Sequence, residues 1–201
     1  MLDRLALKLV KPATEAAAVR LSAQGLTADQ ATLAGFGFGM IAAIMIAWGL
    51  PTAAILPLLL NRALDGVDGA LARLDRPTER GAFLDITLDF VFYGTIPLAF
   101  AAVDPAANGL AAAVLLAAFL ATGTSFLAFA VMAEKRGLKS TAYPSKSFYY
   151  LGGLTEGTET ILCFLAMCLW PEHFTTIAYV YALLCAVTVA TRLVFGWKTF
   201  A

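Results

Sequence analysis

Long apolar runs separated by short polar breaks follow one another along almost the whole of this 201-residue chain. Most of the runs reach the roughly twenty residues that a helix needs to cross a bilayer. Pro51, Asp104, Pro105, Pro171 and Glu172 mark three of the breaks. The pattern predicts an all-α integral membrane protein with six transmembrane helices. Their approximate limits are 30–49, 52–74, 80–103, 109–134, 149–170 and 174–196.

Residues 1–22 follow a different pattern, in which leucines recur at helical spacing with basic residues between them. These residues are Leu2, Arg4, Leu5, Lys8, Leu9 and Lys11. The spacing favours an amphipathic helix that lies in the cytoplasmic membrane interface, with a disordered, weakly basic leader as the alternative. We expect Pro12 to kink or restart this helix. The chain as a whole is predicted to form a single membrane domain, residues 1–201, with the six-span bundle over about 30–196.

The composition of the chain argues against several classes of function. The chain is 60% apolar and only 14% charged, which is too apolar for an ordinary soluble domain. Its net charge of zero gives no reason to expect nucleic-acid binding. The single histidine, His173, speaks against zinc sites of the HExxH type and against serine–histidine triads. Cys163, Cys168 and Cys185 match no zinc or redox spacing, and we interpret them as packing residues.

Basic residues are placed unevenly between the expected loops. The breaks near 49–52, 104–109 and 171–173 contain no lysine or arginine, and all fourteen basic residues lie on the other side or close to it. The positive-inside rule then places both termini and the loops 74–80 and 134–148 in the cytoplasm. An even number of spans agrees with this placement. We expect a multi-pass protein of the cell (inner) membrane.

Four aspartates interrupt the second and third apolar segments, where a bare carboxylate costs roughly 2.5–3.5 kcal/mol. Asp65 and Asp68 are three residues apart, and Asp85 and Asp89 are four apart, so each pair shares one face of its helix. The connection through Pro77 lets the two helices return antiparallel, which brings the pairs together near the cytoplasmic end. Carboxylates suit hard cations such as Mg²⁺ or Mn²⁺, which Asp65, Asp68 and Asp85 would hold.

The residues around the aspartates suit a phosphate ligand. Gly66, Gly69, Gly81 and Ala72 are small, which leaves room for a bulky ligand or a close helix contact. Arg73 adds a planar cationic donor that matches phosphate oxygens. Metals, a phosphate-binding arginine and small neighbours together resemble a site for phosphoryl transfer at a diphosphate.

This motif resembles the signature of the CDP-alcohol phosphatidyltransferase family. The family pattern is D-x-x-D-G-x-x-A-R, a short gap, and then G-x-x-x-D-x-x-x-D. Residues 65–89 match it without departure at Asp65, Asp68, Gly69, Ala72, Arg73, Gly81, Asp85 and Asp89. The six-span arrangement is also similar to the fold of the family. Residues 26–35 look like a degraded form of the family's Pro-Asn-x-x-Thr motif at the start of the first span, and no role is assigned to Thr32.

The resemblance implies a reaction in which an alcohol hydroxyl attacks the phosphorus of a CDP-alcohol, commonly CDP-diacylglycerol, and CMP leaves. It implies that Asp65, Asp68 and Asp85 bind the metal, which would be two Mg²⁺ or Mn²⁺ ions. Asp89 would act as general base and also touch the second metal. The CDP site would be lined by Gly69, Ala72, Arg73 and Gly81. The resemblance further implies a homodimer and a role in phospholipid biosynthesis among membrane lipids.

The acceptor alcohol stays open. Lys146 is either a phosphate contact or a positive anchor at the headgroups. Glu156 and Glu159 are three residues apart, so both can face the cavity, or they can pair with Lys146, Arg136 or Arg192. The resemblance implies that family members with phosphorylated acceptors tend to place arginines in this region. None occurs between 137 and 191, which speaks against a phosphorylated acceptor.

Three other interpretations compete with the enzyme. A cation-coupled transporter would use the aspartates as an ion site, but it predicts inverted repeats, and the acidic cluster has no counterpart later in the chain. A magnesium-stapled scaffold without activity would not need a base. A salt-bridge network with Arg62, Arg73 and Arg80 is the structural alternative, although four acids exceed what these arginines can pair neatly.

Overall fold

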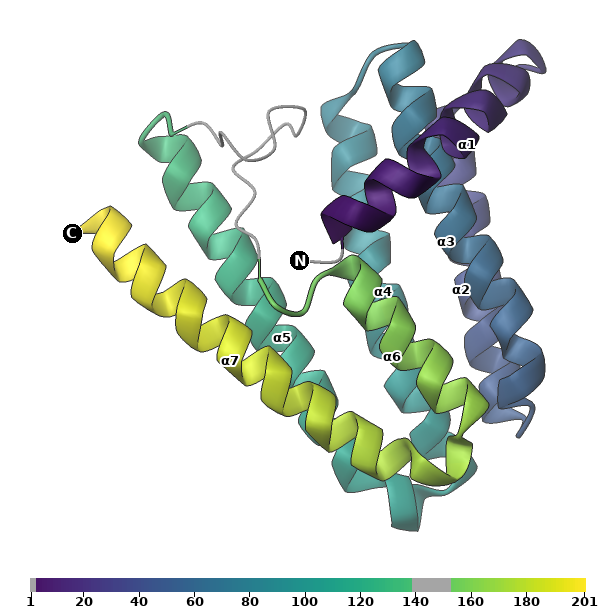
Figure 1. Cartoon of the computed structure of the whole chain (residues 1–201), viewed down its shortest axis with the longest axis vertical. Coiled ribbons are helices and arrows are strands. Elements are labelled where there is room, and N and C mark those ends of the chain that lie inside the picture. Colours follow the sequence, from purple (N-terminus) through teal and green to yellow (C-terminus); the bar gives the residue numbers. More distant parts are fainter. Residues whose placement is uncertain (1–2, 139–152) are drawn as a thin grey trace.

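The computed structural model describes residues 3–138 and 153–201, and within these ranges it consists of helices without any strand. The all-α prediction is therefore confirmed. Figure 1 shows the course of the chain through these helices. Their bounds are α1 Asp3–Ala23, α2 Ala28–Ala47, α3 Pro51–Leu74, α4 Glu79–Val103, α5 Pro105–Lys135, α6 Gly157–Leu169, the short 3₁₀ helix η1 Pro171–His173, and α7 Phe174–Phe200.

Local signals in the sequence explain where the helices begin and end. Thr27 and Gln30 form a capping box at the start of α2, because each side chain accepts a hydrogen bond from the other residue's backbone N–H. Gly49 adopts a left-handed φ of 77° directly after α2, and Pro51 then starts α3. The side chain of Thr78 caps α4 through the N–H of Gly81, at 3.0 Å.

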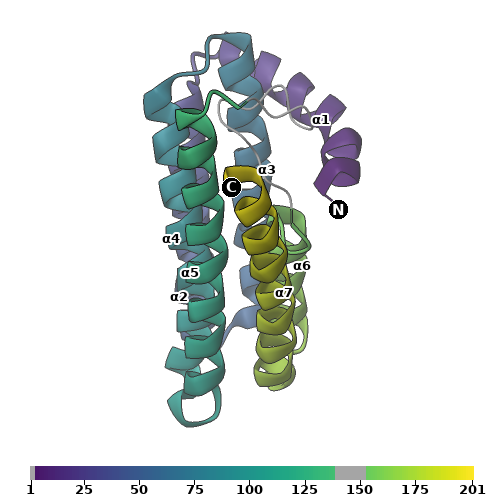
Figure 2. The same ribbon diagram turned by 90° about the vertical axis from the view of Figure 1, so that its left-hand side faces the viewer.

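Consecutive helices from α2 to α5 run antiparallel, as do α6 and α7, and α1 crosses obliquely over α3 (Figures 1 and 2). Helix α2 packs against both α3 and α4, α4 packs against α5, and α5 packs against α7. The turn between α3 and α4 lies at one end of the bundle. The connections near residues 48–50, 104 and 170–173 lie at the opposite end. The uneven placement of basic residues in the sequence thus corresponds to the two ends of the bundle.

Four of the helices, α2, α4, α5 and the segment Pro171–Phe200 that contains α7, are long and apolar enough to cross a membrane. Helix α3 is not among these four, because it contains several charged residues. Helix α6 has 13 residues, about 20 Å at 1.5 Å per residue, against a hydrocarbon core of about 30 Å. Six spans therefore stay a prediction, and residues 149–152 of the expected fifth span lie outside the described residues.

Helix α1 runs through Pro12 without the expected break. Its second half packs on α3, where Ala18 lies fully buried beside Val67, Ala70 and Leu71. A proline removes one helical hydrogen bond, and the packing of the second half of α1 on α3 stabilises the helix. The disordered alternative is wrong for residues 3–22, which are helical, whereas the position of this helix in a membrane interface stays a prediction.

The core between the helices is aromatic and aliphatic. Phe92 and Tyr93 of α4 contact Phe164 of α6, and Phe119 of α5 joins them. Phe92 is only 1% exposed, so this aromatic pair packs the core. The three cysteines are buried and free, which agrees with their interpretation as packing residues. This core joins α4, α5 and α6, while α2 packs against both α3 and α4.

Candidate metal and phosphate site

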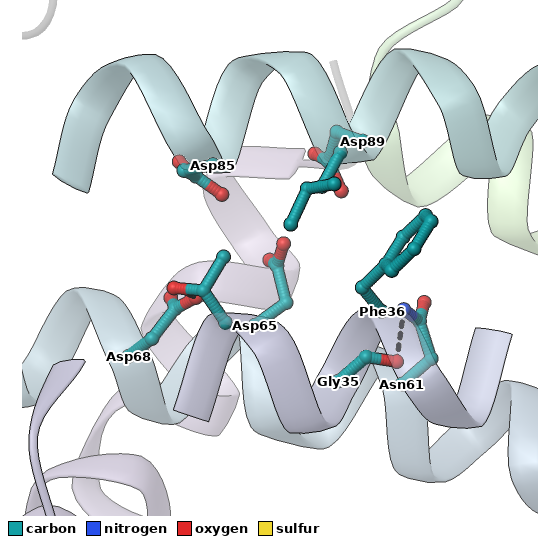
Figure 3. Close-up of a pocket in the computed structure, with 9 residues that line it drawn as sticks. Gly35, Phe36, Asn61, Asp65, Asp68, Asp85 and Asp89 are labelled. Atoms are coloured by element: carbon teal, nitrogen blue, oxygen red, sulfur yellow. Dashed lines mark hydrogen bonds between the residues drawn. The ribbon is translucent and has the colours of Figure 1, made fainter. Parts of the chain in front are cut away.

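Three of the four aspartates converge between α3 and α4. Asp65 offers a carboxylate oxygen from α3, Asp85 and Asp89 offer one each from α4, and these oxygens lie within 4.8 Å of one another. Figure 3 shows the carboxylates of the two helices directed toward each other. All three groups are partly buried. The antiparallel pairing of two helices with i,i+3 and i,i+4 aspartates therefore produces the cluster that the spacing predicted.

Asp68 lies in the same pocket but outside this group of three. Its side chain is buried, and Asp68 Oδ2 accepts a hydrogen bond from Thr32 Oγ1 on α2 at 2.6 Å. A contact from α2 was not expected, because no role was assigned to Thr32. The feature of the sequence that could have pointed to Thr32 is its position in the second turn of α2, shortly after the N-cap Thr27.

Arg62 is the cation nearest to the cluster. Its guanidinium forms an ion pair with Asp65, lies 4.0 Å from Asp89 and donates a hydrogen bond to the Tyr93 hydroxyl at 3.1 Å. The salt-bridge alternative thus holds for Arg62. Three carboxylates facing one guanidinium still leave a formal charge of minus two, that is, −3 + 1, in a half-buried place. Such an excess of negative charge favours a divalent cation.

The other two arginines of that alternative lie elsewhere. Arg80 pairs with Asp29 on α2 at 2.5 Å, and its side chain is largely exposed. Arg73 is exposed and turns back toward Gly69, where an added Cβ would lie 3.5 Å from its guanidinium. Arg73 is therefore available to a ligand that approaches this end of α3.

The glycines near the aspartates leave space for different neighbours. A Cβ at Gly81 would come within 3.1 Å of both Asp29 and Thr78, so Gly81 allows a close contact with α2. A Cβ at Gly66 would come within 3.1 Å of Thr14, so this glycine allows α1 to approach. At Gly69 only the flexible Arg73 side chain lies within contact distance, which leaves room for a ligand. Ala72, one turn later, is half-buried.

Helix α2 closes the pocket from the third side. Gly35 and Gly39 allow it to approach, since a Cβ on Gly39 would lie 2.6 Å from the Phe92 ring. Through this approach Asn61 of α3, one turn before Asp65, donates from Nδ2 to the Gly35 carbonyl at 2.9 Å. Asn61 was missed in the sequence because a lone amide matches no ligand spacing. The pocket is lined by Thr32, Gly35, Phe36, Asn61, Asp65, Asp68, Asp85, Leu88 and Asp89.

The residues considered for the acceptor lie near the start of α6. Glu156 is buried at the N-terminus of this helix and accepts a hydrogen bond from the Gly153 N–H at 2.9 Å. Glu159 follows in the first turn of α6. Arg192 of α7 is buried and donates to the Thr122 carbonyl at 2.8 Å. Lys146 lies outside the described residues.

The donor set of the cluster fits a hard divalent cation. Its groups are carboxylate oxygens from two helices, the ligand type that Mg²⁺ and Mn²⁺ prefer. Their oxygens, all within 4.8 Å of one another, are close enough for one ion to be shared by the three groups. On α3, Gly69 lies one turn after Asp65, and the exposed Arg73 lies one turn after Gly69. This arrangement can hold a metal-bound diphosphate.

The chain matches known proteins over most of its length. The family model for CDP-alcohol phosphatidyltransferase matches residues 26–195. Inner membrane protein YnjF of Escherichia coli (strain K12) is 48% identical over 199 residues, which cover 99% of this chain and 97% of that protein. An uncharacterized protein of Aquifex aeolicus (strain VF5) is 41% identical over 109 residues, 53% of this chain and 50% of that protein.

Solved structures share the fold. Phosphatidylinositol phosphate synthase (PgsA1) of Mycobacterium tuberculosis with CDP-DAG bound superposes with a TM-score of 0.73 at 22% identity, covering 92% of this chain and 93% of that one. The same synthase in complex with manganese and citrate also gives a TM-score of 0.73 at 22% identity, covering 92% of this chain and 88% of that one. At this identity the likeness establishes the arrangement of the helices.

Proposed function

Because the chain belongs to the CDP-alcohol phosphatidyltransferase family and is an enzyme of that class, we propose that it transfers a phosphatidyl group from CDP-diacylglycerol, or a related CDP-alcohol, to an alcohol hydroxyl and releases CMP. The observation that carries this proposal is the convergence of Asp65, Asp85 and Asp89 at the positions of the family motif. The complex of PgsA1 with CDP-DAG supports the choice of donor.

The metal site in this proposal consists of Asp65, Asp68, Asp85 and Asp89, which hold Mg²⁺ or Mn²⁺, two ions by analogy with the family. When bound, the cation offsets charge on the diphosphate and on the departing CMP. The manganese complex of PgsA1 supports the metal type. Asp68 also links two helices, because it accepts a hydrogen bond from Thr32 and so joins α3 to α2.

Asp89 is proposed as the general base. It lies one helical turn beyond Asp85, so a hydroxyl that approaches the phosphorus can pass its proton to the Asp89 carboxylate. The new bond joins the acceptor oxygen to phosphorus, and the bond between phosphorus and the CMP oxygen breaks. Arg62, 4.0 Å from Asp89, is placed to pair with this carboxylate before the substrates arrive.

The CDP moiety is proposed to bind toward the α3–α4 turn, along Gly69, Ala72, Arg73 and Gly81. Gly69 gives space for the phosphates, and the exposed Arg73 guanidinium can pair with their oxygens. Gly81 contributes because its lack of a side chain allows α4 to lie close to Asp29 of α2. The proposal also includes six spans, cytoplasmic termini and a homodimer in the inner membrane.

The assay that tests this function measures CMP release. Purified protein in detergent is incubated with CDP-diacylglycerol, Mg²⁺ and a panel of phosphorylated and unphosphorylated alcohols, and lipid products are identified by mass spectrometry. We expect CMP and one new phosphodiester lipid in equal amounts. Asp85→Asn serves as the matched control, since it keeps the shape of the side chain and removes its charge. No CMP release with any member of the panel would contradict the proposal.

A further inference from the structure

Asn61 carries a buried hydrogen-bond acceptor that the proposed reaction does not use. The residue is 4% exposed, and in the described part of the chain its Oδ1 atom has no hydrogen-bond partner. A buried polar atom without a partner costs about 1–3 kcal/mol. This residue nevertheless lines the same pocket as Asp65 and Asp89, as Figure 3 shows.

The orientation of the amide follows from its other contact. Asn61 Nδ2 lies 2.9 Å from the Gly35 carbonyl oxygen, which can only accept a hydrogen bond. Rotation of the amide by 180° would bring two oxygens together. The oxygen of Asn61 is therefore the atom that is left to face a ligand.

A second asparagine gives a useful comparison. Asn108, at the opposite end of the bundle, donates from Nδ2 to the Phe100 carbonyl at 3.0 Å. Its Oδ1 accepts a hydrogen bond from Thr175 at 3.3 Å. Both polar atoms of the Asn108 side chain thus have protein partners, whereas in Asn61 only Nδ2 has one.

The pocket itself offers no donor for Asn61 Oδ1. Its polar lining consists of carboxylates, which accept when ionised, and Thr32, whose hydroxyl lies within hydrogen-bond distance of Asp68 and the Ala28 carbonyl. An acceptor alcohol has a single O–H at its reacting oxygen, and Asp89 takes that proton. A water molecule has two O–H groups and can donate to Asn61 and to a carboxylate at once.

The space fits one water molecule. About 10 Å³ of the pocket is accessible to the centre of a water molecule, close to the roughly 10–15 Å³ that a single water requires. Mg²⁺ commonly keeps several waters among its ligands. We propose that Asn61 Oδ1 holds one water molecule at the inner end of the carboxylate pocket, and that this water is a ligand of the divalent cation. This inference rests on the metal site of the proposed function.

Asn61 is then a positioning residue, because it acts on the cation through the water. Groups that orient a metal ligand in this way typically change metal affinity by about 10–100-fold when they are lost. Asn61→Leu removes the acceptor oxygen at similar volume, so we expect its Kd for Mn²⁺ to rise at least about tenfold. Asn61→Asp keeps an acceptor oxygen, so its Kd should stay at or below the wild-type value.

The experiment titrates each purified full-length variant with Mn²⁺, without substrates, and follows the electron paramagnetic resonance signal of free Mn²⁺. In deuterated water, the echo modulation from deuterons near bound Mn²⁺ should be weaker in Asn61→Leu than in the wild type and in Asn61→Asp. Asn108→Leu is the matched control for the loss of an amide. It should lower the thermal midpoint without changing the Mn²⁺ affinity.

The outcomes separate the two proposals. A purely structural role predicts that Asn61→Leu and Asn61→Asp lose the bond to Gly35 alike and leave Mn²⁺ affinity unchanged. Unchanged affinity in Asn61→Leu, or equal losses in both variants, would overturn the inference and leave the proposed function intact. If instead the wild type binds no Mn²⁺, or Asp85→Asn binds it equally well, the proposed metal site fails and the inference fails with it.

Discussion

Two regions of the molecule differ in what fills the space between their helices. Between α2, α3 and α4 lies a small polar pocket with about 10 Å³ accessible to a water centre, surrounded by carboxylates. Between α5 and α7 lies a groove of about 550 Å³ that is lined mostly by apolar side chains such as Phe129, Met132 and Trp197. The larger hollow has few groups that can carry out chemistry, whereas the smaller one holds four acids.

The difference shows how each region keeps its shape. In α2–α4 the helices approach through Gly35 and Gly39, and polar contacts such as the Asn61–Gly35 hydrogen bond fix their register. In α5–α7 the contacts include ring pairs, such as Phe129 with Phe195 at a centroid distance of 5.6 Å, and hydrogen bonds such as that from Arg192 to the Thr122 carbonyl. Changes in the first region should therefore alter turnover, and changes in the second should alter mainly stability. The four predictions below test this division.

Removal of metal should have the largest effect. Exhaustive treatment with EDTA should reduce CMP release to background, because the uncompensated carboxylates repel both one another and the diphosphate. Added Mg²⁺ or Mn²⁺ should restore the rate. Hydrogen exchange with and without Mn²⁺ should show protection gained in α2–α4 and little change at the far end of α5–α7. Full activity after chelation, verified by metal analysis, would remove the metal from the mechanism.

Asp89→Asn should reduce kcat by about 10²–10⁴, the usual contribution of a general base. The amide keeps the shape of the carboxylate but cannot take the proton of the hydroxyl. Binding of the CDP-alcohol, measured by titration calorimetry, should change much less than kcat. Normal turnover in this variant would show that another group accepts the proton. Thr87→Ala on the exposed face of α4 is a suitable control for a nearby helix substitution.

Gly39→Ala should have an intermediate effect on turnover. Its Cβ would lie 2.6 Å from the Phe92 ring and 3.2 Å from Asn61 Nδ2, so α2 must shift away from α3 and α4. Overpacking of this kind costs about 1–3 kcal/mol of stability. A displacement of about 1 Å at a reaction site can lower the rate up to roughly 100-fold.

Gly37→Ala is the matched control on the same helix, because a Cβ at Gly37 would meet nothing within 4 Å. It should leave kcat unchanged and stabilise the helix by up to about 1 kcal/mol. CMP release and thermal midpoints of the two variants are measured side by side. Equal behaviour of the two alanines would mean that the close approach of α2 does not shape the site.

The sequence anticipated this division in part. The aspartate spacing was sufficient to predict that the carboxylates of α3 and α4 meet, because helical periodicity fixes which residues share a face. Arg62 was recognised only as an alternative partner, since charge alone does not say which acid a flexible arginine will reach. Asn61 gave no signal, because its role depends on the approach of α2. The 13-residue length of α6 was also not predicted, because the expected span 149–170 included the residues before Gly157.

Phe174→Leu should have the smallest effect on turnover. Phe174 of α7 is fully buried and stacks on Phe100 with ring centroids 4.6 Å apart, at the end of the bundle away from the aspartates. Loss of such an aromatic pair costs about 0.5–1.5 kcal/mol beyond the lost buried area. We expect a lower thermal midpoint with unchanged kcat, KM and Mn²⁺ affinity. A loss of kcat that persists well below the melting temperature would mean that packing at the far end controls the geometry of the carboxylates, and the two regions would then act as one.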